Sequence, residues 1–239
     1  LFRSSAASDV YKRQEAMTLE VHDAFGDWKR ARRDDEGSGH VAFVPTMGAL
    51  HEGHADLIRM ARQEAGRSGH VVVSVYVNPT QFNDAADFEG YPNTREADIR
   101  MADSAGADAV VFPRPDELYP DGIPERADPV DYGGVTALWE AAHRPGHFDG
   151  VVAVVRALFH QVEPDRAYFG EKDWQQLAVV SELVRREFPD LTIVPVPTRR
   201  EGDGLAMSSR NVRLNEAERR AAPMLSCLLY TSDAADERN

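Results

Sequence analysis

The sequence predicts an α/β fold, a doubly wound parallel sheet with helices on both faces. Segments of strand character alternate with segments of helical spacing over most of the 239 residues, which is the pattern of a parallel sheet. One run, Val71–Val77 (VVVSVYV), is β-branched and almost entirely apolar, as expected for a strand covered on both faces. Polar and charged residues replace the alternation after Pro197, so we expect a second, smaller domain to begin there.

Short apolar segments are the predicted strands of this sheet. They are rich in valine, isoleucine or aromatic residues, which suit the pleated, half-buried surface of a sheet. We expect the first two of them to lie side by side and parallel at its centre. In chain order the predicted strands are His40–Pro45, Val71–Val77, Ala109–Phe112, Arg166–Phe169 and Leu191–Val196.

Longer segments between these strands have the spacing of amphipathic helices. In the first of them, Leu57, Ile58 and Ala61 fall on one face. Thr94 can cap the second helix, and Pro189 ends the last one. In chain order the predicted helices are Glu52–Ala65, Thr94–Ala105, Gly150–Val162 and Trp174–Phe188.

Composition and charge exclude several classes of protein. No apolar run approaches the ~20 residues of a membrane helix, and the start lacks the pattern of a secretion signal, so we expect a cytoplasmic protein. The 27 basic and 40 acidic residues give a net charge of −13, which argues against a broad nucleic-acid or anionic-membrane surface. The single cysteine excludes an internal disulfide and a cysteine-based zinc site.

The two ends of the chain have the sequence of translated sequencing adapter. Ser4–Gln14 (SSAASDVYKRQ) and Cys227–Glu237 (CLLYTSDAADE) can be encoded by one transposon-end oligonucleotide in opposite orientations. The alternative is a pair of natural tails. We therefore expect artefactual tails at 1–14 and 227–239, which leaves a natural segment truncated at its C-terminal end. The expected division is a main domain at 15–197 and the start of a truncated, smaller C-terminal domain at 198–226.

Val44–His54 (VPTMGALHEGH) is the richest candidate for chemistry. A strand ends at Pro45, a glycine-containing turn follows, and His51 and His54 share one face of the helix start. A helix N-terminus favours phosphate, and imidazoles can donate hydrogen bonds to it. A zinc pair on a helix would need histidines four apart with a glutamate, and a plain capping turn would need no histidines. Phosphate binding is therefore the preferred interpretation.

Four blocks in a fixed order carry a family resemblance. They are PTMGALHEGH (Pro45–His54), NPTQF (Asn78–Phe82), FGEKDWQQL (Phe169–Leu177) and DGLAMSSRN (Asp203–Asn211). The first resembles the HIGH motif of the nucleotidyltransferase and class I tRNA-synthetase superfamily. Together the blocks resemble the pantoate–β-alanine ligase family. The resemblance covers Val41–Leu214 and implies a Rossmann-like sheet and a ligase that joins (R)-pantoate to β-alanine through a pantoyl adenylate, releasing AMP and pyrophosphate.

The resemblance also implies the residues of the site. Catalytic roles fall on His54, His51, Lys172, Ser208, Ser209 and Arg210. The expected ATP-binding set is Met47, Gly48, Ala49, Leu50, His51, Glu52, Gly53, His54, Gly170, Glu171, Lys172, Asp173, Arg199, Met207, Ser208, Ser209 and Arg210. The residues expected to bind pantoate are Gln81, Gln176 and Met47, and Gln81 is also expected to bind β-alanine. Arg144 and His147 are expected in a neighbouring substrate loop.

Residue chemistry alone supports part of this assignment. Lys172 can bind phosphate as a point charge, although beside Asp173 it could equally form an ordinary surface pair. Met207–Arg210 offers two hydroxyls and a guanidinium, which suit a mobile loop over a polyphosphate; the alternative is a solvated loop.

One position departs from the family pattern. Arg199 stands where the family usually has a small apolar residue, at a site that in the family touches adenine through its backbone.

The remaining histidines and tryptophans are given structural roles. His40, His70 and His143 are expected to be solvated or structural. Trp28, Trp139 and Trp174 are expected to pack rather than to form a stacking platform.

Cofactors and partners follow from the same resemblance. ATP is a substrate, Mg²⁺ bridges its phosphates with few protein ligands, and no protein metal site is expected. The partners are small molecules, with neither nucleic acid nor membrane, and the intact parent protein is expected to be a homodimer. Two rival functions stay open: another HIGH-motif nucleotidyltransferase, which would want more arginine for a phosphorylated acceptor, and a catalytically dead nucleotide-binding fragment.

Overall fold

The computed structural model describes residues 19–34 and 39–224. The predicted artefactual tails, 1–14 and 227–239, lie outside the described residues.

A parallel six-stranded sheet forms the centre of the described chain, in the order β1-β4-β3-β2-β5-β6. Its strands are β1 (Glu20–His22), β2 (Val41–Thr46), β3 (His70–Val75), β4 (Ala109–Val111), β5 (Arg166–Gly170) and β6 (Thr192–Val196). The predicted central pair is confirmed, because β2 runs parallel to β3 from Val41 beside His70 to Thr46 beside Val75. The sequence interpretation missed β1, a three-residue edge strand too short to show a periodic pattern.

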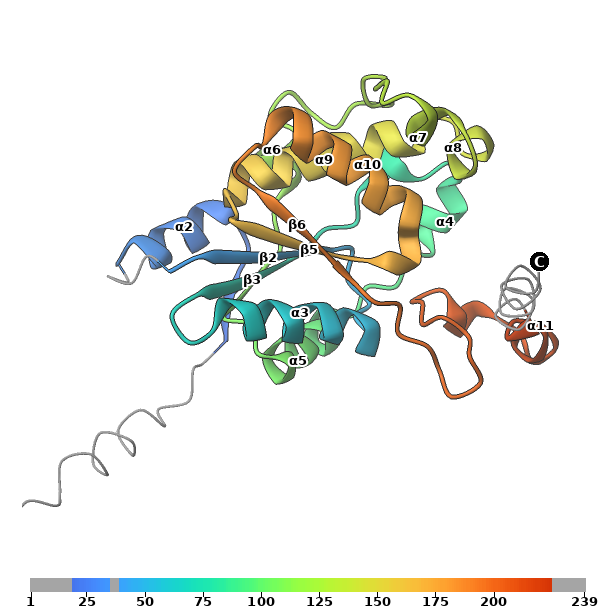
Figure 1. Cartoon of the computed structure of the whole chain (residues 1–239), viewed down its shortest axis with the longest axis horizontal. Coiled ribbons are helices and arrows are strands. Elements are labelled where there is room, and N and C mark those ends of the chain that lie inside the picture. The colour runs from blue at the N-terminus through green and yellow to red at the C-terminus, as the bar shows by residue number, and fades with distance from the viewer. Residues whose placement is uncertain (1–18, 35–38, 225–239) are drawn as a thin grey trace, which may run out of the picture.

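Helices cover both faces of the sheet, as predicted (Figure 1). On one face lie α3 (Glu52–Ala65) and α5 (Arg95–Ala105); on the other lie α9 (His147–Val162) and α10 (Trp174–Glu187). Alternate residues of β2 serve the two layers, since Phe43 packs toward α9 and Val44 packs toward α3. Each face of the sheet therefore has its own apolar core.

The start of α9 differs from the prediction. The helix begins at His147, three residues before the predicted Gly150, after Gly146 in the left-handed region at φ 81°. Gly150 lies inside the helix. The position takes a glycine because the backbone of Thr80 lies against it. A Cβ at Gly150 would come within 2.3 Å of the Thr80 carbonyl oxygen. This glycine marks a close approach of two backbones rather than the beginning of a helix.

Thr94 also behaves differently from the prediction. It occupies the residue before α5, but its side chain makes no capping hydrogen bond to the helix amides. Its Oγ1 instead donates to the Asp98 carboxylate at 3.0 Å. Asp98 is 2% exposed. Its carboxylate also accepts from the amides of Ala49 and Leu50, so the Thr94 hydroxyl is one of several donors to a buried anion.

Two of the three tryptophans contradict the packing prediction. Trp28, in α2 (Phe25–Asp34), is 1% exposed, and its indole donates to His70 Nε2 at 3.1 Å. These two structural roles are confirmed. Trp139 and Trp174 are each 68% exposed; Trp139 precedes the short helix α8 and Trp174 is the first residue of α10, so neither lies on a buried helix face.

Short elements fill the connections and the end of the described chain. They are η1 (Pro79–Gln81), α4 (Ala85–Glu89), α6 (Pro115–Leu118), α7 (Gly134–Ala137), α8 (Glu140–His143), η2 (Glu171–Asp173), η3 (Asn211–Arg213) and α11 (Glu216–Ala221). After β6, an antiparallel bridge joins Arg200 to Ala206, and the chain leaves the sheet toward α11 (Figure 1). That this segment begins a separate domain stays a prediction.

Candidate active site

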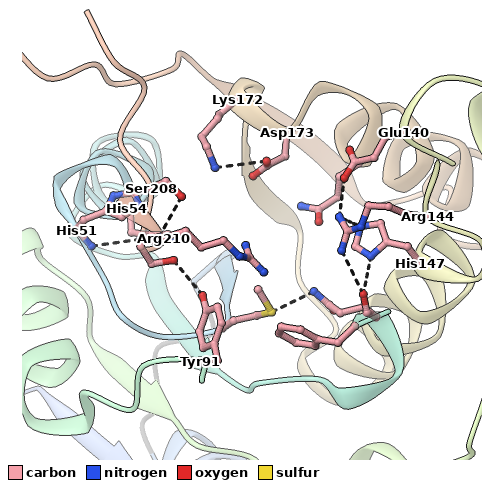
Figure 2. Close-up of a pocket in the computed structure, with 15 residues that line it drawn as sticks. His51, His54, Tyr91, Glu140, Arg144, His147, Lys172, Asp173, Ser208 and Arg210 are labelled. Atoms are coloured by element: carbon pink, nitrogen blue, oxygen red, sulfur yellow. Dashed lines mark hydrogen bonds and ion pairs between the residues drawn. The ribbon is translucent and has the colours of Figure 1, made fainter. Parts of the chain in front are cut away.

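A cavity lies where β2, β3 and β5 end, the edge at which doubly wound sheets bind ligands. Figure 2 shows side chains from several segments pointing into it. The lining residues are Met47, His51, His54, Gln81, Phe82, Tyr91, Glu140, Arg144, His147, Lys172, Asp173, Gln176, Ser208, Ser209 and Arg210. Most of the residues that the sequence singled out are therefore gathered in one place, although they come from distant parts of the chain.

His51 and His54 form the N-terminal cap of α3. His51 Nδ1 accepts from the amide of Gly53 at 3.1 Å, and His54 Nδ1 accepts from the amide of His51 at 3.3 Å. Their ring centroids are 4.1 Å apart. The sequence interpretation that set capping aside was wrong, since the histidines themselves are the cap. Two of the amides expected to bind phosphate are thus occupied, and the free ring edges remain.

The capping bonds determine which ring nitrogens can donate. An amide N–H can only donate, so Nδ1 of both rings accepts, and the neutral rings carry their protons on Nε2. Burial lowers the pKa of His54 to about 3, with His51 and Lys172 adding to the effect. Burial also lowers the pKa of His51, again with help from Lys172. Near neutral pH the pair therefore offers two neutral Nε2–H donors.

Lys172 lies on η2, directly after the end of β5 at Gly170. Its Nζ is 3.5 Å from Asp173 Oδ1, and the side chain is 37% exposed. The surface pair considered from the sequence is present, but it stands on the cavity wall and acts electrostatically on both imidazoles. The lysine therefore supplies positive charge to the side of the cavity that holds the histidines.

A second cavity adjoins the first and is lined by more apolar residues. Both cavities share His51, His54, Lys172, Asp173 and Gln176. The second adds Pro45, Gly53, Leu57, Tyr168, Phe169, Gly170, Val196, Pro197, Thr198, Arg199 and Met207. The guanidinium of Arg199 donates to both oxygens of Asp56, at 3.1 and 3.0 Å. This pairing with α3 explains how an arginine is accommodated at the position where the sequence departs from the family pattern.

The opposite wall of the first cavity is built around Gln81. Its side-chain Nε2 donates to Met47 Sδ at 3.0 Å, and its backbone carbonyl oxygen lies 2.7 Å from His147 Nδ1. Because a carbonyl can only accept, His147 Nδ1 donates, and Nε2 is left to accept from Arg144 Nη1 at 3.1 Å. Burial lowers the pKa of His147, which agrees with a neutral ring. Arg144 also pairs with Glu140 at 2.5 Å.

The serine–arginine segment, Met207–Arg210, also contributes to the first cavity. Ser208, Ser209 and Arg210 all line it, and Met207 lines the adjoining cavity. Ser209 Oγ is 3.2 Å from the hydroxyl of Tyr91. Figure 2 shows Ser208 and Arg210 on the same side of the cavity as His51 and His54, with Arg144 and His147 on the other side.

Five members of the expected ATP-binding set line neither cavity: Gly48, Ala49, Leu50, Glu52 and Glu171. The amides of Ala49 and Leu50 donate to the buried Asp98 at 3.1 and 2.8 Å. Glu52 pairs with Arg59 on the surface of α3. The family block at Pro45–His54 is therefore split: its histidines face the cavity, while its central turn is held by Asp98.

Sequence reasoning missed Phe82, Tyr91 and Glu140 as cavity residues. Glu140 lies four residues before Arg144, a spacing that predicts an ion pair on a helix and could have revealed it. Nothing in the sequence around Tyr91 indicates its place, because its contact with Ser209 joins segments more than a hundred positions apart.

Comparison with known proteins identifies the family. A family model described as pantoate-beta-alanine ligase matches residues 17–239. The chain belongs to this family. Pantothenate synthetase of Bdellovibrio bacteriovorus is 49% identical over 213 residues, which cover 89% of this chain and 80% of the relative. That of Rubrobacter xylanophilus is 52% identical over 77% of this chain and 64% of its own length.

Solved pantothenate synthetase structures share the fold. The enzyme from Thermus thermophilus superposes with a TM-score of 0.82 at 44% identity, over 92% of this chain and 77% of that one. Pantoate-beta-alanine ligase from Francisella tularensis, solved with beta-gamma ATP and beta-alanine, gives 0.80 at 35%, over 89% and 80%. The predicted fold, family and ligase class are confirmed. Within the described ranges, no helix has the length and apolarity needed to cross a membrane.

Proposed function

We propose that the chain condenses (R)-pantoate with β-alanine, using ATP and forming pantoyl adenylate as the intermediate. The observation that carries this proposal is the composition of the two opposite cavity walls. One wall has two neutral imidazole donors, Lys172 and the serine–arginine segment, which suit a polyphosphate. The other has the amide of Gln81 and the thioether of Met47, with Arg144 paired to Glu140, which suit a small hydroxy acid.

In the first step, a carboxylate oxygen of pantoate attacks the α-phosphorus of ATP. The new P–O bond forms as the bond to the β-phosphate oxygen breaks, and pyrophosphate leaves with the bonding electrons. His51 and His54 would donate from Nε2 to phosphate oxygens as negative charge builds there. Lys172 and Arg210 would neutralise the leaving pyrophosphate. Because these donors are already fixed by the fold, they stabilise the transition state without reorganising.

Gln81 and Gln176 would orient pantoate through its hydroxyl and carboxylate groups. An amide can both donate and accept, so it can hold a hydroxyl without adding charge near the attacking oxygen. The contacts of Gln81 with Met47 and His147 hold its side chain and its backbone in place. Positioning of the carboxylate beside the α-phosphorus would therefore be its main contribution.

In the second step, the free amine of β-alanine attacks the carbonyl carbon of pantoyl adenylate. The C–N bond forms, the C–O bond breaks so that AMP leaves with the bonding electrons, and the amine proton passes to solvent. β-Alanine would approach Gln81 on the wall that also carries Arg144 and His147. Because Glu140 pairs with Arg144, that wall is not strongly cationic, and the cationic pyrophosphate subsite stays on the opposite side.

Magnesium would enter with ATP. When bound, it would neutralise phosphate charge, and it usually keeps several waters and takes few protein ligands. The Asp173 carboxylate, beside Lys172 on the cavity wall, is suitably placed to contribute one oxygen. The homodimer and the lid domain at 198–226 rest on the family resemblance alone and, like the cytoplasmic location, stay predictions.

Pyrophosphate release tests the proposal. The 239-residue chain is mixed with ATP, Mg²⁺ and pantoate, with and without β-alanine. We expect one equivalent of pyrophosphate per active site without β-alanine, and continuous release with equal amounts of AMP and pantothenate when it is added. Release that needs a phosphorylated acceptor instead would indicate a different nucleotidyltransferase. Binding of ATP without any pyrophosphate would indicate a nucleotide-binding fragment.

A further inference from the structure

One carboxylate outside the cavity lining holds two arginines, Arg210 of the serine–arginine segment and Arg213 of η3. Asp87, in α4, accepts from Arg210 Nη2 at 2.8 Å and from Arg213 Nη1 at 2.7 Å. Arg213 also donates to the carbonyl of Gly90 at 2.5 Å. The side chain of Asp87 is 28% exposed. With a further bond of 3.4 Å from Arg210 Nε to Asp87, four hydrogen bonds therefore join η3 and the residue before it to α4 and the glycine after it, although more than a hundred positions separate them in sequence.

The same stretch of chain makes further contacts through Tyr91. Its hydroxyl is 3.2 Å from Ser209 Oγ, and the guanidinium of Arg210 lies 5.7 Å from the ring centroid. Tyr91 itself lines the cavity. Figure 2 shows the Arg210 side chain extending across the cavity above Tyr91. The end of Arg210 thus has two supports, an anion on one side and an aromatic face on the other.

The support continues to the wall that carries Gln81. Phe82 follows Gln81, and its ring makes edge contacts with Phe88 and Tyr91 at centroid distances of 5.4 and 5.8 Å. Asp87 and Phe88 are neighbours in α4. One short helix therefore connects the cavity wall at Gln81 with the segment that brings Arg210 and the serines.

Charge balance shows why Asp87 matters for the orientation of Arg210. Two guanidinium groups share one carboxylate, so the group retains one net positive charge. Two arginines this close would repel one another without Asp87, and Arg210 would lose its preferred orientation. Hydrogen bonds from Arg210 and Arg213 lower the pKa of Asp87, so the carboxylate is charged throughout the neutral range.

We propose that Asp87 is a positioning residue, which holds Arg210 where it can meet the leaving pyrophosphate while Gln81 holds the acid. This inference rests on the proposed function and adds to it a link between the two substrate walls. Asp87 does not touch substrate. Its effect should fall on the step that releases pyrophosphate, because the second step transfers an acyl group from AMP and involves no pyrophosphate.

The test compares Asp87→Asn with Asp84→Asn. Asp84 caps α4 through a hydrogen bond from the amide of Ala86 at 2.8 Å, and asparagine caps equally well, so this variant is a matched control on the same helix. For Asp87→Asn we expect kcat of pyrophosphate release to fall about tenfold with little change in pantoate KM. Conversion of supplied pantoyl adenylate and β-alanine should keep its rate. Asp84→Asn should match the unmodified chain in both steps.

An activity-independent measurement separates this inference from the proposed function. Amide hydrogen exchange is followed over 208–214 in the chain without ligands. Asp87→Asn should accelerate exchange there, whereas Asp84→Asn should not. Equal exchange in both variants, or equal loss of both chemical steps in Asp87→Asn, would overturn the positioning role. If the unmodified chain releases no pyrophosphate but Asp87→Asn still loosens the segment, the proposed function fails and the anchoring by Asp87 stands.

Discussion

The imidazoles of His51 and His54 lie 4.1 Å apart because each accepts an amide hydrogen from the first turn of α3. One pair of bonds thus caps a helix and fixes two tautomers. The helix could be capped by many residues, but only histidine can cap it through one edge of a ring and present a neutral N–H donor from the other.

Capping and donation can be separated at His51. Asparagine accepts the same amide hydrogen as an N-cap residue but cannot present the Nε2–H. We expect His51→Asn to keep the thermal midpoint and to lower kcat of pyrophosphate release by about 10²–10³, the usual cost of one transition-state donor. The His51→Ala variant is the comparison, and it should lose stability as well as activity. A large loss of stability in His51→Asn with normal kcat would contradict the assignment.

Gln176 should affect binding rather than chemistry. Its amide lines both cavities, and we assign it to pantoate before and during the reaction. Gln176→Ala should therefore raise pantoate KM and change kcat little, because it removes an interaction common to the ground state and the transition state. Steady-state kinetics with pantoate varied at saturating ATP measures this, with ATP KM as the internal control. A fall in kcat alone would reject the role.

The buried histidines should make the fold sensitive to acid. His54 has a pKa of about 3 in the folded chain against an ordinary value of 6.5, and burial also lowers the pKa values of His51 and His147. Between about pH 3 and pH 6.5 the unfolded chain therefore binds more protons than the folded chain. Stability is fully present above about pH 6.5 and declines as the pH falls toward 3.

Urea unfolding at about pH 7.5 and about pH 5 measures this decline. A His54→Gln variant should show a weaker dependence of the unfolding free energy on pH. The exposed His143 supplies the control, since His143→Gln should keep the full dependence. Identical dependence in His54→Gln and the unmodified chain would show that His54 does not contribute.

Gly150 should tolerate no side chain. Alanine there would place Cβ 2.3 Å from the Thr80 carbonyl oxygen, so α9 and η1 must move apart. We expect Gly150→Ala to destabilise the fold by about 1–3 kcal/mol and to raise pantoate KM, because Gln81 follows Thr80. Gly134→Ala is the control, since its nearest contact would be an ordinary 3.5 Å to Leu138. Equal unfolding midpoints for the two variants would refute the close approach.

Local pattern was sufficient for much of the fold. The strands β2 to β6 and the helix α3 are predicted within about two residues, because fully buried strands and amphipathic helices have strong periodic patterns. Gly150 misled the prediction of α9, since a glycine that permits a close approach looks in sequence like one that begins a helix. The packing prediction for Trp139 and Trp174 was wrong for another reason. The sequence shows that a side chain is apolar, but not whether another element covers it.

The sequence by itself determined the fold class, the family and most of the residue types that line the cavity, since these depend on periodicity and on motifs within a few neighbouring positions. Only the tertiary structure decided how those residues are held. It turned the Ala49 and Leu50 amides toward Asp98 and joined Arg210 to Asp87. Such contacts join segments far apart in the chain, and hydrogen bonds across that separation leave no periodic pattern in one sequence.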